Sequence, residues 1–152
     1  MSRRYLEDLK PGEVQTFGSA RLTVEAIKAF AAKFDPQPFH LDETAAKASL
    51  FQGLAASGWH TAALTMQMLV CDMPGKLALL ASPGFDDLRW LKPVRPGDQL
   101  HVRCTCLDVS PSRSHPERGH ARFKIETFNQ ADECVMHYIS LTLIARRPTA
   151  SG

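Results

Sequence analysis

The chain has 152 residues, of which 44% are hydrophobic and 22% charged, and its net charge is +2 at pH 7 with neutral histidines. This composition is typical of a single globular domain and excludes a disordered, collagen-like or fibrous protein. The net charge is too small to indicate nucleic acid as a partner. Because the N-terminus lacks a signal-like apolar stretch and no run reaches the ~18 apolar residues of a spanning helix, we expect a cytoplasmic protein with no membrane partner.

The cysteines give no indication of a metal or redox site. There are four, and none of them form a C-x-x-C pair. Cys104 and Cys106 alternate on one face of an expected strand, which favours small apolar core residues. His40 and Asp42 have a spacing that a metal could use, but no third ligand is evident, so we expect no metal.

The first part of the chain reads mainly as helix. A strand over residues 13–18 follows a Pro-Gly turn, and Thr23 then precedes apolar residues that recur at helical spacing over 24–34. The two prolines that follow cannot continue this helix, so residues 35–40 are expected to form a stiff, extended loop.

The next segment predicts a short helix and then a long one. Asp42 is the expected N-cap of a helix over residues 43–48, and a glycine-containing connection covers 52–57. Residues 59–72 are apolar on nearly every side, and a helix with this pattern is normally buried all round.

The second half alternates as strands do. Strands are expected over residues 85–91, 100–109, 121–129 and 133–145, with a hairpin turn at 130–132. A buried helix followed by long antiparallel strands indicates the α+β class, with a sheet wrapped around the helix. We expect one domain over residues 1–152, with its core at about 5–147.

The segment with the clearest chemistry runs from Asp35 to His40. A carboxylate and an imidazole lie five residues apart with two prolines between them, and a turn would bring both within reach of one water. Asp35 also fits a turn residue before proline, and His40 a structural histidine.

A second candidate element opens the long helix. Gly58 would let a carbonyl approach the unpaired N–H groups of the first helical turn, where the helix dipole favours negative charge. Ser57 fits a hydrogen-bond donor to substrate or an ordinary turn serine. His60 faces either the site or, as the better fit, the core or an interface.

Together these segments resemble the MaoC-like dehydratase family of hotdog-fold proteins, which includes the (R)-specific enoyl-CoA hydratases. The resemblance rests on Asp35, Pro38, His40 and the Ala-Ser-Gly step at 56–58, and covers most of residues 5–146. The chain departs from the family in that Ser57 stands where histidine is frequent.

The resemblance implies a hydro-lyase that adds water across a 2-enoyl-thioester, with Asp35 as principal base, His40 as its partner and the Gly58 N–H as donor to the thioester oxygen. Coenzyme A, or acyl carrier protein, would carry the substrate, and no further cofactor is implied. Phe39, Ser57, Trp59 and His60 are the candidate substrate-binding residues.

The resemblance also implies a homodimer or a higher homo-oligomer. Two other functions on the same fold stay open. A thioesterase normally needs an acidic residue on the central helix, and none occurs there before Asp72. The second is a non-catalytic domain that binds acyl-thioesters.

Overall fold

The computed structural model describes residues 2–149, in which five strands and one long helix form the body of the molecule. In chain order the elements are the 3-10 turn η1 (Leu6–Asp8), β1 (Val14–Arg21), α1 (Val24–Phe34), α2 (Pro38–Leu41), α3 (Glu43–Lys47), α4 (Gly58–Cys71), β2 (Leu79–Trp90), β3 (Gln99–Pro111), β4 (Arg118–Phe128) and β5 (Cys134–Ala145).

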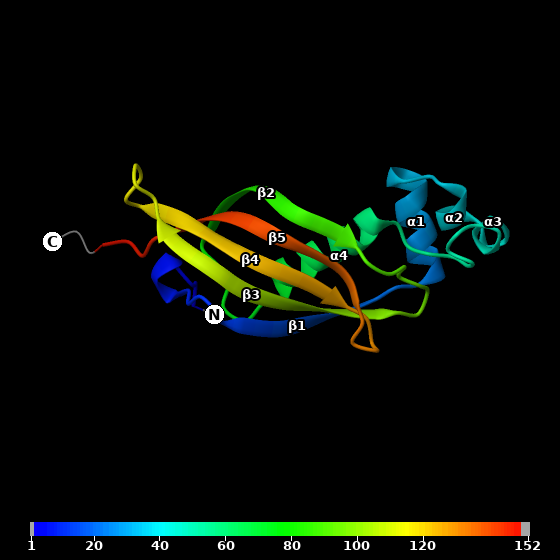
Figure 1. The fold of residues 1–152 in the computed structure, drawn as a ribbon, viewed down its shortest axis with the longest axis horizontal. Helices are drawn as coiled ribbons and strands as arrows, with labels where there is room; N and C mark the ends of the chain where they lie inside the picture. Colours follow the sequence, from blue (N-terminus) through cyan, green and yellow to red (C-terminus); the bar gives the residue numbers. More distant parts are fainter. Residues whose placement is uncertain (1, 150–152) are drawn as a thin grey trace.

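The five strands form one antiparallel sheet in the order β1-β3-β4-β5-β2. Figure 1 shows this sheet lying across α4, with α1, α2 and α3 gathered at one end of the molecule and both termini towards the other. β1 and β2 are therefore the two edge strands. The α+β architecture predicted from the sequence, a sheet around a long helix, is confirmed.

Local sequence signals explain most of the element boundaries. The Thr23 hydroxyl accepts a hydrogen bond from the Ala26 N–H at the start of α1, and the Asp42 carboxylate accepts one from the Thr44 N–H at the start of α3. The period-two face of β3 lies in the core as predicted: the side chains of Leu100, Val102, Cys104 and Cys106 are all buried.

The prediction of an extended loop over residues 35–40 holds for 35–37 and is wrong from Pro38 onward. Pro38 begins the helical turn α2, and His40 lies within it. Proline is compatible with the first helical position because the N–H it lacks would have no partner there and its φ is already helical. The consequence is that the chain turns back within the segment that carries the predicted pair.

The prediction that the long helix is buried on every side is also wrong for a single copy of the chain. The side chains that α4 buries include the polar His60, Thr61 and Thr65, whereas the apolar Trp59 and Val70 are more than half exposed. The apolar residues of α4 thus extend over a face that its own sheet does not cover. Within the described residues, no helix is both long enough and apolar enough to cross a membrane.

Candidate active site

Asp35 and His40 meet where α1 ends and α2 begins. Asp35 is the C-cap of α1, and its backbone N–H donates to the Ala31 carbonyl. The Oδ2 atom of Asp35 lies 3.4 Å from Nε2 of His40. The His40 ring is almost completely buried, while the carboxylate retains some exposure to solvent. The helical turn that the sequence did not predict brings these two side chains together.

The tautomer of His40 follows from its other hydrogen bond. Nδ1 lies 2.6 Å from the carbonyl oxygen of Ala55. A carbonyl can only accept, so Nδ1 carries a proton and donates it. In the neutral ring Nε2 is then unprotonated, and its lone pair faces the Asp35 carboxylate. Two acceptors that face each other at this distance are suited to share a proton or to hold one water that donates to both.

The N-terminus of α4 lies beside this pair. Ser57 is the N-cap residue, but its hydroxyl makes no cap hydrogen bond and donates instead to Asp35 Oδ2 at 2.7 Å. The N–H groups of His60 and Thr61 are both bonded to the Ser57 carbonyl. Among the described residues, no acceptor is recorded for the N–H of Gly58 or Trp59, which leaves these two donors available.

Trp90, at the end of β2, covers the first turn of α4. Its indole Nε1 donates to the Gly58 carbonyl at 2.8 Å. The ring lies so close to Gly58 that a Cβ atom at this position would be 2.5 Å from it. Glycine is therefore required here by the approach of an aromatic ring.

An open cavity of about 330 Å³ is formed at this junction, with Asp35 and His40 in its wall. Gly58 and Thr61 line it from α4, and Trp90 from β2. The remaining lining residues are Phe51, Ala56, Trp59, Leu91, Lys92, Pro93 and Val94. The cavity thus brings the Asp35 and His40 side chains and the first turn of α4 to one space.

The four candidate substrate-binding residues lie in different surroundings. Trp59 lines the cavity and packs edge-on against Trp90. Ser57 is fully buried against Asp35. Phe39 contacts the His40 ring and is not part of the cavity wall. Of the four, Trp59 alone reaches the cavity surface within the described chain, and the substrate-binding roles stay predictions.

His60 points away from the cavity. Its ring stacks on Phe30 of α1, with the ring centroids 4.6 Å apart and the planes 5° apart. Burial lowers the pKa of His60, and its Nδ1 is buried with no hydrogen-bond partner in the described part of the chain. A neutral histidine packed between helices matches the preferred interpretation of this residue as core.

Sequence reasoning did not find the Ala55 carbonyl that fixes the His40 ring, nor the roles of Phe51 and Trp90 in the cavity wall. A backbone carbonyl leaves no residue-type signal, and Trp90 is 32 positions away from Gly58. The one usable signal was glycine at a helix start, which indicates a close approach by some other group.

No group of three or more histidine, cysteine, aspartate or glutamate side chains suited to a metal ion occurs within residues 2–149. Cys104 and Cys106 are free and buried, and burial raises the pKa of Cys104 to about 12, so its thiol stays protonated at neutral pH.

Comparison with known proteins decides the family. The model of the MaoC like domain matches residues 8–126. The chain belongs to the MaoC-like domain family. It is 47% identical to the MaoC-like dehydratase from Rhodospirillum rubrum, with a TM-score of 0.88 over 96% of this chain and 99% of that one.

Two other solved structures relate this MaoC-like domain to described proteins. The R-hydratase PhaJ1 from Pseudomonas aeruginosa is 25% identical, with a TM-score of 0.72 over 95% of this chain and 86% of that one. A Mycobacterium tuberculosis protein with a double hotdog fold is 18% identical, with a TM-score of 0.77 over 99% of this chain and 46% of that one. The MaoC-like domain described here is therefore a hotdog fold, and its family includes hydratases and dehydratases.

Proposed function

We propose that this protein is a hydro-lyase that adds water reversibly across the double bond of a 2-enoyl-thioester. The observation that carries the proposal is the geometry of the pair: in the neutral ring, whose tautomer is set by the Nδ1 bond to the Ala55 carbonyl, the His40 Nε2 lone pair faces Asp35 Oδ2 at 3.4 Å. The similarity to an R-hydratase and to a MaoC-like dehydratase supports the same reaction class.

In this proposal one water donates hydrogen bonds to the Asp35 carboxylate and to His40 Nε2. Asp35 accepts a proton from the water while the water oxygen forms a bond to C3 of the enoyl group. The electron pair of the C2–C3 double bond moves to C2 and is delocalised onto the thioester oxygen. The pair then returns the proton to C2, so the whole water molecule is added and both side chains regain their starting states.

The thioester oxygen is assigned to the N-terminus of α4. Gly58 lines the cavity, its N–H has no recorded acceptor among the described residues, and the positive end of the helix dipole favours the enolate charge. No redox cofactor or metal enters this scheme. The thioester carrier is coenzyme A or an acyl carrier protein.

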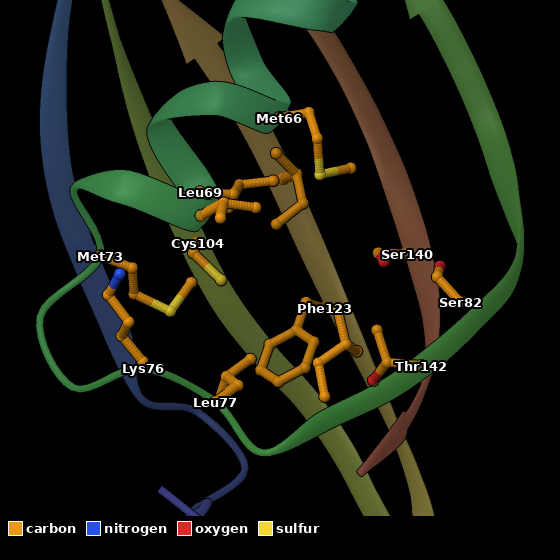
Figure 2. Close-up of a pocket in the computed structure, with 13 residues that line it drawn as sticks. Met66, Leu69, Met73, Lys76, Leu77, Ser82, Cys104, Phe123, Ser140 and Thr142 are labelled. Atoms are coloured by element: carbon orange, nitrogen blue, oxygen red, sulfur yellow. The ribbon is translucent and has the colours of Figure 1, made fainter. Parts of the chain in front are cut away.

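The acyl chain is assigned to a groove along the exposed face of α4. Trp59 lines both the active-site cavity and a second cavity of about 280 Å³, which lies between α4, β2 and β5. Met66 separates this from a third cavity of about 190 Å³, and Figure 2 shows the side chains of Met66, Leu69, Met73 and Phe123 around it. The walls are mainly apolar, as an aliphatic chain requires.

We also propose a homodimer in which a second copy covers this face. β2 is an edge strand with exposed apolar side chains, among them Leu79, Leu80 and Phe85, and it lies beside the exposed apolar face of α4. An uncovered apolar edge of this kind favours pairing with another strand. A partner on this side would close the open wall of the acyl groove.

The function is tested by following loss of enoyl absorbance with crotonyl-CoA and with longer 2-enoyl-CoAs. We expect turnover by the wild type and a fall of about 100-fold or more in kcat for Asp35→Asn and for His40→Gln. Both variants should keep the circular dichroism spectrum of the wild type, since each substitution preserves size and a polar group.

Release of free thiol is measured in parallel on saturated acyl-CoAs. Thiol release without any change in enoyl absorbance would contradict the proposal and favour a thioesterase. Binding of acyl-CoA with no turnover at any chain length would contradict it in favour of a non-catalytic binding domain.

A further inference from the structure

We propose that Ser57 is a positioning residue that holds the Asp35 carboxylate against His40 and, by doing so, leaves the N-terminus of α4 open to the thioester oxygen. The inference rests on the proposed function for its catalytic consequence. It assigns Ser57 to Asp35 and not to the substrate, because the single hydroxyl proton is already donated to the carboxylate.

The surroundings of Ser57 define its hydrogen bond. Its side chain is completely buried, and the distance from Oγ to Asp35 Oδ2 is 2.7 Å. An ionised carboxylate can only accept, so the serine must donate. A charge-assisted bond of this length, from a buried hydroxyl to a partly buried carboxylate, fixes the orientation of both side chains.

The same carboxylate oxygen serves both neighbours. Asp35 Oδ2 lies at hydrogen-bond distance from the Ser57 hydroxyl and 3.4 Å from His40 Nε2. The serine thereby fixes the torsion angle of the carboxylate with Oδ2 directed at the imidazole. A carboxylate without this restraint could rotate about its terminal bond, where the torsional preference is weak.

The position of Ser57 in the helix supports the assignment independently. Serine at an N-cap normally accepts a hydrogen bond from an N–H of the first helical turn, which contributes about 1 kcal/mol to stability. Here the N-cap serine makes no such bond. The hydroxyl is diverted to Asp35, and the Gly58 and Trp59 N–H groups are left without a recorded acceptor among the described residues. The Ser57 side chain therefore both orients the Asp35 carboxylate and leaves the N–H groups at the start of α4 without a cap.

The test compares wild type with Ser57→Ala and Ser57→Thr. Alanine removes the donor, whereas threonine keeps the hydroxyl. For alanine we expect kcat to fall about tenfold with KM within twofold. The acid limb of the kcat profile should move to higher pH, because a hydrogen bond to the charged carboxylate is lost. Threonine should restore the wild-type profile at least in part.

Thr65→Val is the matched control. It removes a completely buried hydroxyl from α4, one that donates to the Thr61 carbonyl, is bonded to the Thr127 hydroxyl and does not line the active-site cavity. We expect it to lower the melting temperature without moving the pH profile. An unchanged pH profile and kcat in Ser57→Ala would overturn the proposal, and so would an equal shift in Thr65→Val.

A measurement without turnover separates this inference from the proposed function. The carboxyl carbon of Asp35 is followed by NMR against pH, with its signal assigned from Asp35→Asn. His40 is the titratable side chain recorded within ion-pair distance of Asp35, and it is present in every variant. A titration midpoint that rises in Ser57→Ala supports the inference even if the enzyme is inert on every thioester tested. An identical midpoint in both proteins rejects it.

Discussion

Gly58 is confined by an aromatic ring on one side and by the start of α4 on the other. Substitution by alanine would place a Cβ 2.5 Å from the Trp90 indole, a distance that heavy atoms do not adopt, so Trp90 must move. We predict that Gly58→Ala lowers the free energy of unfolding by about 1–3 kcal/mol and also lowers kcat, because the ring and the helix start shift together. Urea denaturation and the enoyl assay measure the two effects.

Gly84 provides the control for this substitution. It lies in β2, has no atom within 4 Å of its Cβ position and does not adopt a positive φ. Gly84→Ala should leave stability and rate close to wild type. If Gly58→Ala behaved in the same way, the close contact with Trp90 would not constrain the site.

At the scale of residues, the sequence predicted the polar members of the site and not the contacts that orient them. Asp35, His40 and Gly58 were identified from residue type and spacing, and the structure brings them to one cavity. The Ala55 carbonyl and the Ser57 to Asp35 bond depend on how distant segments pack, 15 and 22 positions apart, and no local pattern encodes them.

At the scale of elements, the loop between α3 and α4 is held by Arg95 from the β2–β3 connection. Its guanidinium donates to the carbonyls of Phe51, Gly53 and Leu54, immediately before the Ala55 and Ser57 contacts. Because lysine has no planar fork, we predict that Arg95→Lys lowers the free energy of unfolding by about 1–3 kcal/mol. It should also lower kcat, since the loop carries the acceptor for His40.

Arg122→Lys is the matched control for this effect. Arg122 is exposed on β4, and its guanidinium pairs with Asp108 on β3, where solvent screens the interaction. We expect its unfolding curve and its kcat to overlay those of the wild type. A stable Arg95→Lys protein with full activity would show that the loop holds its conformation without this side chain.

The prediction for residues 35–40 is the one at the element scale whose failure has a clear physical reason. Residues 35–40 were expected to be extended because proline disfavours a continuing helix, yet proline also favours a new helix start, and tertiary contacts select between the two. Strands β1, β3, β4 and β5 were predicted to within a few residues because alternation requires only that one face be buried, as it is along β3. The prediction for β2 was less accurate: the strand begins at Leu79, six residues before the expected strand at 85–91, and its side chains show no buried alternating face.

At the scale of the whole molecule, the apolar pattern of α4 exceeds what one chain can bury. Periodicity predicted a helix buried all round, and within a single copy the apolar Trp59, Met66 and Val70 remain exposed beside β2. The proposed second copy on this side would reconcile the sequence pattern with the observed burial. The same contact would extend the sheet through its β2 edge.

This arrangement is tested with one charge on each edge of the sheet. Leu80 in β2 and Val14 in β1 are both 54% exposed, so glutamate at either position has a similar cost within a single chain. We predict that Leu80→Glu shifts the protein from dimer to monomer in light scattering at micromolar concentration, because an unpaired carboxylate would be buried in the contact. Val14→Glu should leave the mass unchanged.

The KM for 2-enoyl-CoAs of different chain length tests whether this contact between copies closes the acyl groove. If the partner closes the groove, Leu80→Glu should raise KM for long 2-enoyl-CoAs by about tenfold while changing KM for crotonyl-CoA little. In the proposed binding mode a short chain would end within the active-site cavity, before the second cavity beyond Trp59. Val14→Glu should change neither. A monomeric Leu80→Glu protein with wild-type KM at every chain length would show that a single copy binds the acyl chain alone. An equal decrease in molecular mass for Leu80→Glu and Val14→Glu would show that the contact between copies does not lie at β2.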